Sequence, residues 1–530
     1  MFALLGLLMT VTPPDAGVDA VFTARALATE LGREKFDAAV SRFGPEMASN
    51  LTAKVLGQQW QQLTGGLGAF KELGAVREEQ DPRGTVVFVE CRYERSSLHL
   101  KIVLDERLRV IGLRPTSGKT SAEFEAAARE VVKGLQANAW EKVVSRFAPP
   151  MVKALPADAL ARTWQGLVSK SGALQQIEEV RQDSSQLPYT AVDLTCAFEK
   201  ERLTVRIVLD GNLQVGGLFF KPAWNPPATA DRSRFEERPL EVGAAPFKLP
   251  GILTLPKGKG PFPAVVLVHG SGPNDADETL GPNKLFRDLA WSLATKGVAV
   301  LRYSKRTFEY RGKLSNADIA TVKEETIDDA LSAVTALTTV KEIDPKRIIV
   351  AGHSLGAGLA PRIAAADSRV HGIILLAAPA RKLWVLIAEQ RKYLASLGPP
   401  SEASAASIRT ADENAKRLED PAFKATEIVD GIPGAYWLDL RANDDVAIAA
   451  KLTVPMLVLQ GERDYQVTMV DFTGWTKALS KRPNVTLKSY AALNHQFMPG
   501  AGQSTPAEYD RPNHVAAEVV DDVAKWVLSH

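Results

Sequence analysis

Residues 347–360 read RIIVAGHSLGAGLA, and this stretch decides the fold. An apolar run typical of a buried strand leads directly into Gly352-His353-Ser354-Leu355-Gly356, and a helical segment follows. Glycines two positions before and two after Ser354 allow a sharp turn without side-chain clash, which exposes the serine hydroxyl above the sheet. The pattern predicts a nucleophilic Ser354 at a strand-to-helix turn. The alternative is a glycine-rich turn without chemistry, which the strand before it and the helix after it disfavour.

The back half of the chain alternates between strand and helix patterns from about residue 240. Apolar runs rich in Val, Ile and Leu begin at Ala264, Gly297, Arg347, Gly372, Met456 and Val485. Helical segments such as 285–296 and 326–340 lie between them. Near-continuous apolar strands that alternate with helices predict a mostly parallel sheet covered on both faces.

A nucleophilic serine needs a base, and in the α/β-hydrolase fold, which the GHSLG turn resembles, the partners follow in the order serine, acid, histidine. His495 lies in a loop just beyond the last predicted strand and is the preferred base. His514 lies near the start of the C-terminal helix, where a histidine is more often a surface residue or a helix cap. His530 is the last residue. His353 lies inside the turn, where its side chain should point into supporting structure.

The orienting acid should follow the strand that begins at Met456. Asp464 lies in the loop after that strand and is the preferred residue, with Glu462 as its neighbour and competitor. Asp471 is expected to lie beyond this loop, in the helix that follows it. The acid would hold the imidazole tautomer and stabilise the imidazolium.

Two backbone N–H groups are needed to hold an oxyanion. Leu355, directly after the nucleophile, should supply one. The loop His269-Gly270-Ser271-Gly272-Pro273 follows the strand at Ala264 and should supply the other, which we place at Ser271 with Gly272 as the alternative. His269 is expected to brace this loop rather than to catalyse.

The long segment 269–307, which begins HGSGPNDADETLGPNK, together with GHSLG, GERDYQV and NHQF, resembles the α/β-hydrolase superfamily. It is most similar to bacterial carboxylesterases and the serine aminopeptidase-like group, over roughly residues 240 to 530. The resemblance implies carboxylic ester hydrolysis through an acyl-enzyme, with no metal or organic cofactor. Ala357 stands where relatives often have a second glycine. In this fold an insertion such as that at about 380–450 caps the active site.

The front of the chain contains a tandem repeat. VSRFGPEM from Val40 matches VSRFAPPM from Val144, Trp60 matches Trp164, and Cys91 matches Cys196. Helical spacing followed by alternating strands in each copy predicts two small α+β modules with two or three helices each. The pattern resembles an uncharacterised domain often fused ahead of bacterial hydrolases. The two cysteines are expected to be buried free thiols rather than a disulfide, and the role of the repeats stays open.

Composition excludes several classes of protein. With 64 Lys and Arg against 62 Asp and Glu the net charge is +2, and no basic block indicates a nucleic-acid partner. Two cysteines in 530 residues exclude a disulfide scaffold. Phe2 to Val11 is an apolar run of signal-peptide length, so we expect export, to the periplasm or outside the cell, rather than an N-terminal strand. No stretch is long enough for a transmembrane helix.

These observations predict an α/β-hydrolase fold preceded by two α+β repeat modules. The expected divisions are a signal peptide at 1–17, modules at 18–116 and 120–222, a linker at 223–239 and a catalytic domain at 240–530. The expected function is a serine esterase acting on a small-molecule ester. A peptidase on the same triad, with Glu389 or Glu402 receiving a substrate amine, is the alternative, and a binding protein with a vestigial hydrolase is the third.

Overall fold

The computed structural model describes residues 19–81, 84–95, 97–116, 118–183, 189–311, 314 and 318–530. The chain divides into two compact units, residues 1–221 and 222–530. The expected signal peptide, residues 1–17, lies outside the described residues. Within the described residues, the helices are all too short or too polar to cross a bilayer.

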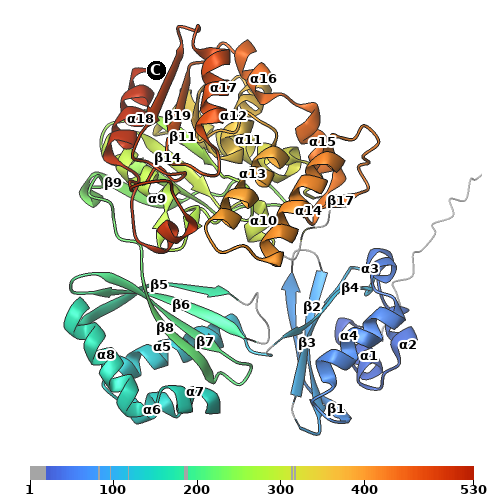
Figure 1. Ribbon diagram of the computed structural model, residues 1–530. Helices are drawn as coiled ribbons and strands as arrows, with labels where there is room; N and C mark the ends of the chain where they lie inside the picture. The colour runs from blue at the N-terminus through green and yellow to red at the C-terminus, as the bar shows by residue number, and fades with distance from the viewer. Residues whose placement is uncertain are drawn as a thin grey trace, which may run out of the picture. The chain divides into compact units, whose positions relative to one another are not determined.

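The first unit contains the two repeat modules, each with four helices followed by a four-stranded meander (Figure 1). The sequence predicted two or three helices per module, because the short helices of five or six residues show too little periodicity to be recognised. The first module consists of α1 (Ala20–Gly32), α2 (Phe36–Val40), α3 (Pro45–Asn50), α4 (Ala53–Thr64), β1 (Phe70–Asp81), β2 (Gly84–Tyr93), β3 (Ser97–Leu104) and β4 (Val110–Thr116). The second consists of α5 (Ser121–Gln136), α6 (Trp140–Val144), α7 (Pro149–Ala154), α8 (Ala157–Ser171), β5 (Leu174–Asp183), β6 (Thr190–Phe198), β7 (Arg202–Leu209) and β8 (Val215–Pro222).

Matching residues of the two modules occupy matching places. Trp60 on α4 and Trp164 on α8 are both buried in the core of their own module. Cys91 on β2 and Cys196 on β6 are both free and fully buried, as expected. Burial raises the pKa of each thiol to about 12, so both stay protonated and act as small apolar core residues.

The second unit is built on an eight-stranded sheet in the order β20-β19-β16-β15-β11-β14-β10-β9. The neighbouring strands from β20 to β14 pair in parallel, and β10 pairs antiparallel with both β14 and β9. The strands are β9 (Phe235–Pro239), β10 (Gly251–Pro256), β11 (Phe262–Val268), β14 (Ala299–Tyr303), β15 (Ile343–His353), β16 (Val370–Leu376), β19 (Met456–Gly461) and β20 (Val485–Tyr490). The mostly parallel sheet predicted from the apolar runs is therefore confirmed.

Part of the segment expected as a linker belongs to this unit. Phe235–Pro239 forms the edge strand β9, and Trp224 is buried in the hydrophobic core beside α9 (Leu285–Thr295). Charged side chains on a short edge strand protect its open side from further pairing, and they also conceal the strand in the sequence. The first residues after the repeats are thus part of the second unit's sheet and core.

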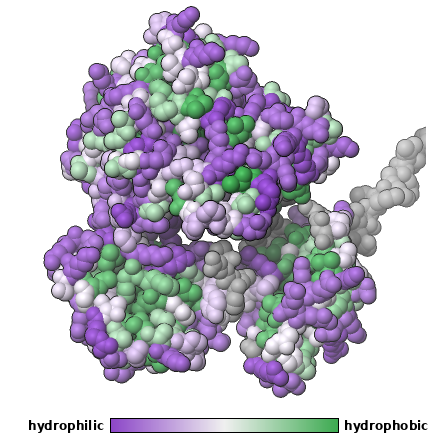
Figure 2. Space-filling view, viewed as in Figure 1, coloured by the Kyte–Doolittle hydropathy of each residue, from purple (hydrophilic) through white to green (hydrophobic). Residues whose placement is uncertain are grey.

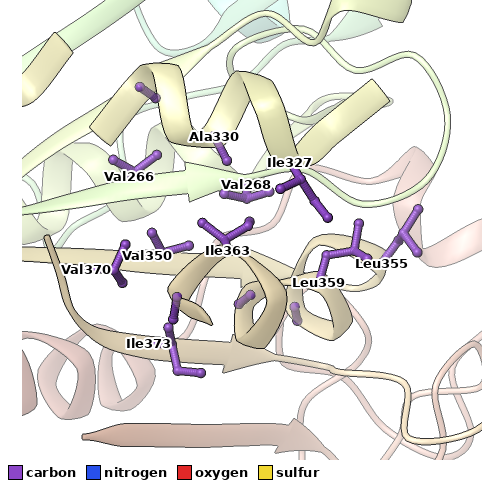
Figure 3. Packing of buried hydrophobic residues seen from close by; sticks show 14 of the residues in the cluster. Val266, Val268, Ile327, Ala330, Val350, Leu355, Leu359, Ile363, Val370 and Ile373 are labelled. Atoms are coloured by element: carbon purple, nitrogen blue, oxygen red, sulfur yellow. The ribbon is translucent and has the colours of Figure 1, made fainter. Parts of the chain in front are cut away.

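Helices cover both faces of the sheet. Apolar residues of α11 (Asp328–Thr338), α12 (Leu355–Ala366) and α17 (Met469–Leu479) share one buried cluster with one face of the strands. Those of α9 and α18 (Ala517–Ser529) share a second cluster with the other face. In Figure 3, Ile363 of α12 points toward Val268 and Val350 on the neighbouring strands β11 and β15. This packing holds α12, and the turn before it, firmly against the strand ends.

Four helices lie in the segment between β16 and β19: α13 (Leu383–Ser396), α14 (Glu402–Glu419), α15 (Gly434–Ala442) and α16 (Asp445–Lys451). We call this the cap segment. Its Trp384, Tyr436 and Trp437 are buried and bond protein atoms through their side-chain N–H or O–H groups. They are packing residues.

The face of the second unit that Figure 2 shows is mostly hydrophilic.

Candidate active site

Ser354 occupies the tight turn between β15 and α12. Its backbone has φ 52° and ψ −120°, a strained conformation for a residue with a side chain. A Cβ on Gly352 would lie 2.1 Å from the carbonyl oxygen of Gly356, and a Cβ on Gly356 would lie 2.4 Å from that of Val268. Both glycines of the motif are therefore required by contact with other backbone, and they allow Ser354 to stand at the end of the strand.

His495 and Asp464 lie together, although 31 residues separate them. Nδ1 of His495 is 2.6 Å from Oδ2 of Asp464, and both side chains are buried. The backbone N–H groups of Gln466 and Val467 donate to Oδ1 of Asp464 at 2.7 and 3.0 Å, and the Gln460 amide donates to Oδ2 at 3.2 Å. A carboxylate that only accepts can fix the imidazole with its proton on Nδ1, which leaves Nε2 as an acceptor.

The competing acids and histidines have other partners. Glu462 is exposed and accepts from the hydroxyl of Ser489 at 2.7 Å. Asp471 is in α17, as expected, and anchors the start of the cap segment by accepting from the N–H groups of Ala380 and Arg381. His514 lies 3.1 Å from the carboxylate of Asp288, in a structural pair.

His530 contacts the last turn of α18. Its Nδ1 lies 2.9 Å from the carbonyl oxygen of Trp526, and the two rings contact each other. The contact secures the end of α18, so this residue is structural as well.

His353 links the serine turn to the loop that carries His495. Its Nε2 lies 3.0 Å from the carbonyl oxygen of His495, and the two rings have centroids 4.7 Å apart. Its Nδ1 lies 3.1 Å from Oε2 of Glu278. Burial opposes a charged imidazole, but the Glu278 carboxylate outweighs it and raises the pKa of His353; the pKa of Glu278 is lowered in turn. This buried pair lies next to the turn, because His353 directly precedes Ser354.

The loop after β11 passes close to Ser354. A Cβ on Gly270 would lie 3.1 Å from Cβ of Ser354. The N–H of Gly270 donates to Oε1 of Glu278 at 2.7 Å, so that group is occupied. Among the hydrogen bonds of the described residues, the backbone N–H groups of Ser271 and Leu355 have no protein acceptor. Both expected oxyanion donors are thus available.

His269 supports this loop, as expected. Its Nε2 lies 3.0 Å from the carbonyl oxygen of Asp275, which can only accept, so Nε2 carries the proton. Burial lowers the pKa of His269 to about 4, so the ring is neutral at ordinary pH. A neutral, buried imidazole whose Nε2 is hydrogen-bonded to the loop fits a role in supporting that loop.

Sequence reasoning missed two charged residues at this site, Glu278 and Lys305. Glu278 is buried between Gly270 and His353, and Nζ of Lys305 donates to the carbonyl oxygen of Gly270 at 3.0 Å. The sequence offers only a weak signal for them, because nothing in the local pattern shows that these two charged residues are buried. Within the described residues, no group of three or more His, Cys, Asp or Glu side chains is arranged so that it could hold a metal ion.

The chain is similar to several known proteins. Residues 265–519 match the Alpha/beta hydrolase family, and residues 24–113 and 128–218 match a family of proteins of unknown function, DUF3887. Esterase EstD of Thermotoga maritima is 40% identical over 409 residues, which cover 76% of this chain and 95% of the relative. Thiohydrolase apmlB of Arthrinium phaeospermum is 30% identical over 147 residues, 28% of this chain and 44% of that protein. The solved structure of the Pyrococcus furiosus esterase Pf2001 is 19% identical with a TM-score of 0.37, covering 58% of this chain and 97% of that chain.

Proposed function

This chain belongs to the α/β-hydrolase family, and on that premise we propose that it is a serine esterase with Ser354, His495 and Asp464 as its catalytic residues. The observation that carries the proposal is the buried contact of 2.6 Å between Nδ1 of His495 and Oδ2 of Asp464, which the contact of His353 with the His495 carbonyl links to the strained turn that holds Ser354. The name of the relative EstD, an esterase, supports the choice of ester over other acyl substrates.

The reaction proceeds in two halves. Nε2 of His495 takes the proton of the Ser354 hydroxyl as its oxygen attacks the ester carbonyl, and then donates that proton to the leaving alcohol. The acyl group is left on Ser354. Water, activated by the same imidazole, then hydrolyses the acyl-enzyme and restores the serine.

Asp464 keeps His495 in the tautomer that can accept this proton and stabilises the imidazolium that forms. The hydrogen bonds from Gln466, Val467 and Gln460 support this role, because they hold the carboxylate in place. The N–H groups of Ser271 and Leu355 hold the oxyanion of each tetrahedral intermediate. Preorganised donors of this kind contribute roughly 10²–10³ in kcat each.

A peptidase on the same residues is less well supported. A pocket for a substrate amine needs an unpaired acid, but Glu389 lies 2.6 Å from Arg381 and Glu402 lies 2.5 Å from Arg409. Both candidate carboxylates therefore already have a cationic partner.

The test is hydrolysis of p-nitrophenyl esters from acetate to palmitate by the wild type and by Ser354→Ala. We expect activity that depends on Ser354 and is greatest with small or medium acyl chains. Aminoacyl p-nitroanilides run in parallel separate the two candidate functions. Activity retained in a folded Ser354→Ala variant would refute the assignment, and anilide rates equal to the ester rates would favour the peptidase.

A further inference from the structure

Lys305 is a buried cation close to the site, and no step of the proposed reaction uses it. It follows β14, and its side chain is 2% exposed. Its Nζ donates to the carbonyl oxygen of Gly270 at 3.0 Å, and its own N–H donates to the carbonyl oxygen of Asn274 at 3.0 Å. One residue therefore holds both ends of the loop that contains Ser271.

The position of this cation has a direct consequence for Ser271. The carbonyl of Gly270 and the N–H of Ser271 belong to one planar trans peptide, so the two bonds point in opposite directions. A cation on the oxygen fixes the direction of the N–H and also polarises it, because hydrogen bonds along one dipole strengthen each other. The preceding N–H, that of Gly270, is held by Glu278 at 2.7 Å, which fixes the neighbouring peptide plane as well.

The amide of Asn274 adds to this restraint. Its Nδ2 lies 3.2 to 3.3 Å from the carbonyl oxygens of Gly270, Ser271 and Gly272. These contacts face the carbonyl side of the loop, as Lys305 does. The N–H of Ser271, which has no acceptor among the hydrogen bonds of the described residues, is left for the substrate.

The charge of Lys305 is balanced by a buried carboxylate that also contacts the cap segment. Its Nζ lies 2.9 Å from Oε1 of Glu325, which is buried in the π-helical turn Lys323–Ile327. The hydroxyl of Tyr436, on α15, donates to Oε2 of the same carboxylate at 2.8 Å. Buried contacts thus run from Tyr436 through Glu325 and Lys305 to the peptide that carries the N–H of Ser271.

We propose that Lys305 is a positioning residue that orients the N–H of Ser271 toward the oxyanion, and that Tyr436 of the cap segment holds Lys305 in that role through Glu325. This inference rests on the proposed function, since it concerns the same oxyanion. It assigns the cap segment a part in assembling the oxyanion site.

The test compares Lys305→Met with Arg306→Met. Arg306 is the matched control: it is the next residue, it is buried, and it is paired with Asp329 at 2.5 Å instead of with the loop. For each variant we would measure kcat and KM for a p-nitrophenyl ester and the inhibition constant of an aryl trifluoromethyl ketone, whose serine adduct carries an oxyanion. Melting temperatures show which variants fold.

Loss of one oxyanion donor costs roughly 10²–10³ in kcat, so misorienting it should cost about 10- to 100-fold. Lys305→Met should lower kcat by that factor, leave KM nearly unchanged and weaken the ketone in proportion to kcat/KM. Arg306→Met should lower the melting temperature but keep ketone binding within about threefold of the wild type. Lys305→Arg, which retains the charge, should restore part of the loss.

Tyr436→Phe removes one hydroxyl and keeps the ring, so it reports on the cap even if Lys305→Met fails to fold. We expect a few-fold loss in kcat and in ketone affinity, again with KM unchanged. Wild-type ketone affinity in a folded Lys305→Met, or in Tyr436→Phe, would overturn the proposal. A wild type that neither hydrolyses the ester nor binds the ketone would instead overturn the proposed function, and the inference with it.

Discussion

Nδ1 of His353 lies 3.1 Å from Oε2 of Glu278, and the contact joins the turn that holds Ser354 to the loop that holds Ser271. Nε2 of the same ring faces the carbonyl oxygen of His495 at 3.0 Å. Both ring nitrogens therefore face oxygen atoms of other segments, and the raised pKa of His353 favours its charged form. His353 thus connects three segments of the site.

The first prediction concerns this charge. A histidine ionises near 6.5 in an unfolded chain, and the pKa of His353 is raised above that value in the fold. Its contribution to stability is therefore complete below about pH 6 and is lost as the pH rises through the raised pKa. In His353→Gln the melting temperature should be lower at pH 6, and it should fall less steeply between pH 6 and 9 than in the wild type. Parallel pH profiles for the two proteins would contradict the charged pair.

The second prediction concerns the acid. Asp464→Asn should lower kcat by roughly 10³–10⁴, because the amide stabilises the wrong tautomer of His495 and cannot balance the imidazolium. Glu462→Gln is the matched control, since Glu462 is an exposed neighbour bonded to Ser489. Steady-state kinetics on one ester decide between them. Equal losses in the two variants would mean that Asp464 is not the acid.

The third prediction concerns the turn itself. In Gly352→Ala the new Cβ would lie 2.1 Å from the carbonyl oxygen of Gly356, and backbone cannot move aside there without disturbing α12. We expect the free energy of unfolding to fall by more than about 4 kcal/mol, which would be seen as a poor soluble yield and a much lower melting temperature. Gly358→Ala, in the same helix, meets only a side-chain atom of Pro379, at 3.1 Å, and should fold. Normal stability in Gly352→Ala would be inconsistent with this geometry.

The fourth prediction concerns Asp445, in the first turn of α16. Burial raises its pKa to about 7, and its Oδ1 is buried without a hydrogen-bond partner among the described residues. An unfolded aspartate ionises near 3.9, so the folded chain holds the extra proton between these values and stability falls as the pH rises from about 4 to 7. Asp445→Asn should match the wild type near pH 4 and exceed it above pH 7, by up to about 4 kcal/mol at about 1.4 kcal/mol per pKa unit.

The control for this experiment is Asp444→Asn. Asp444 is exposed and caps α16 by accepting from the N–H of Ala447, a role that asparagine fills equally well. Its variant should follow the wild type at every pH. If Asp445→Asn also follows the wild type above pH 7, the buried carboxyl carries no penalty.

Local signals made much of the fold predictable. The strand before Ser354 and the helix after it follow from an apolar run and two glycines, and the contacts of Gly352 and Gly356 show why both are needed. His495 was named from chain order and its place after the last strand. The structure brings it to 2.6 Å from Asp464.

Other features were not accessible because they depend on contacts between distant residues. Charged positions hide the edge strand Phe235–Pro239, which forms only by pairing with β10. Lys305 meets Gly270 across 35 residues, and Glu325 meets Tyr436 across 111. No pattern of spacing predicts such pairs, since each requires the complete packing of the sheet and the cap segment.

The central claim is that Ser354 carries the acyl group. The direct measurement is acid quenching of the enzyme during turnover of p-nitrophenyl acetate, followed by peptide mapping by mass spectrometry. We predict one acetyl group on the peptide that contains Ser354, and none in Ser354→Ala. An acetyl group on a different residue, or turnover by Ser354→Ala at the wild-type rate, would contradict the account.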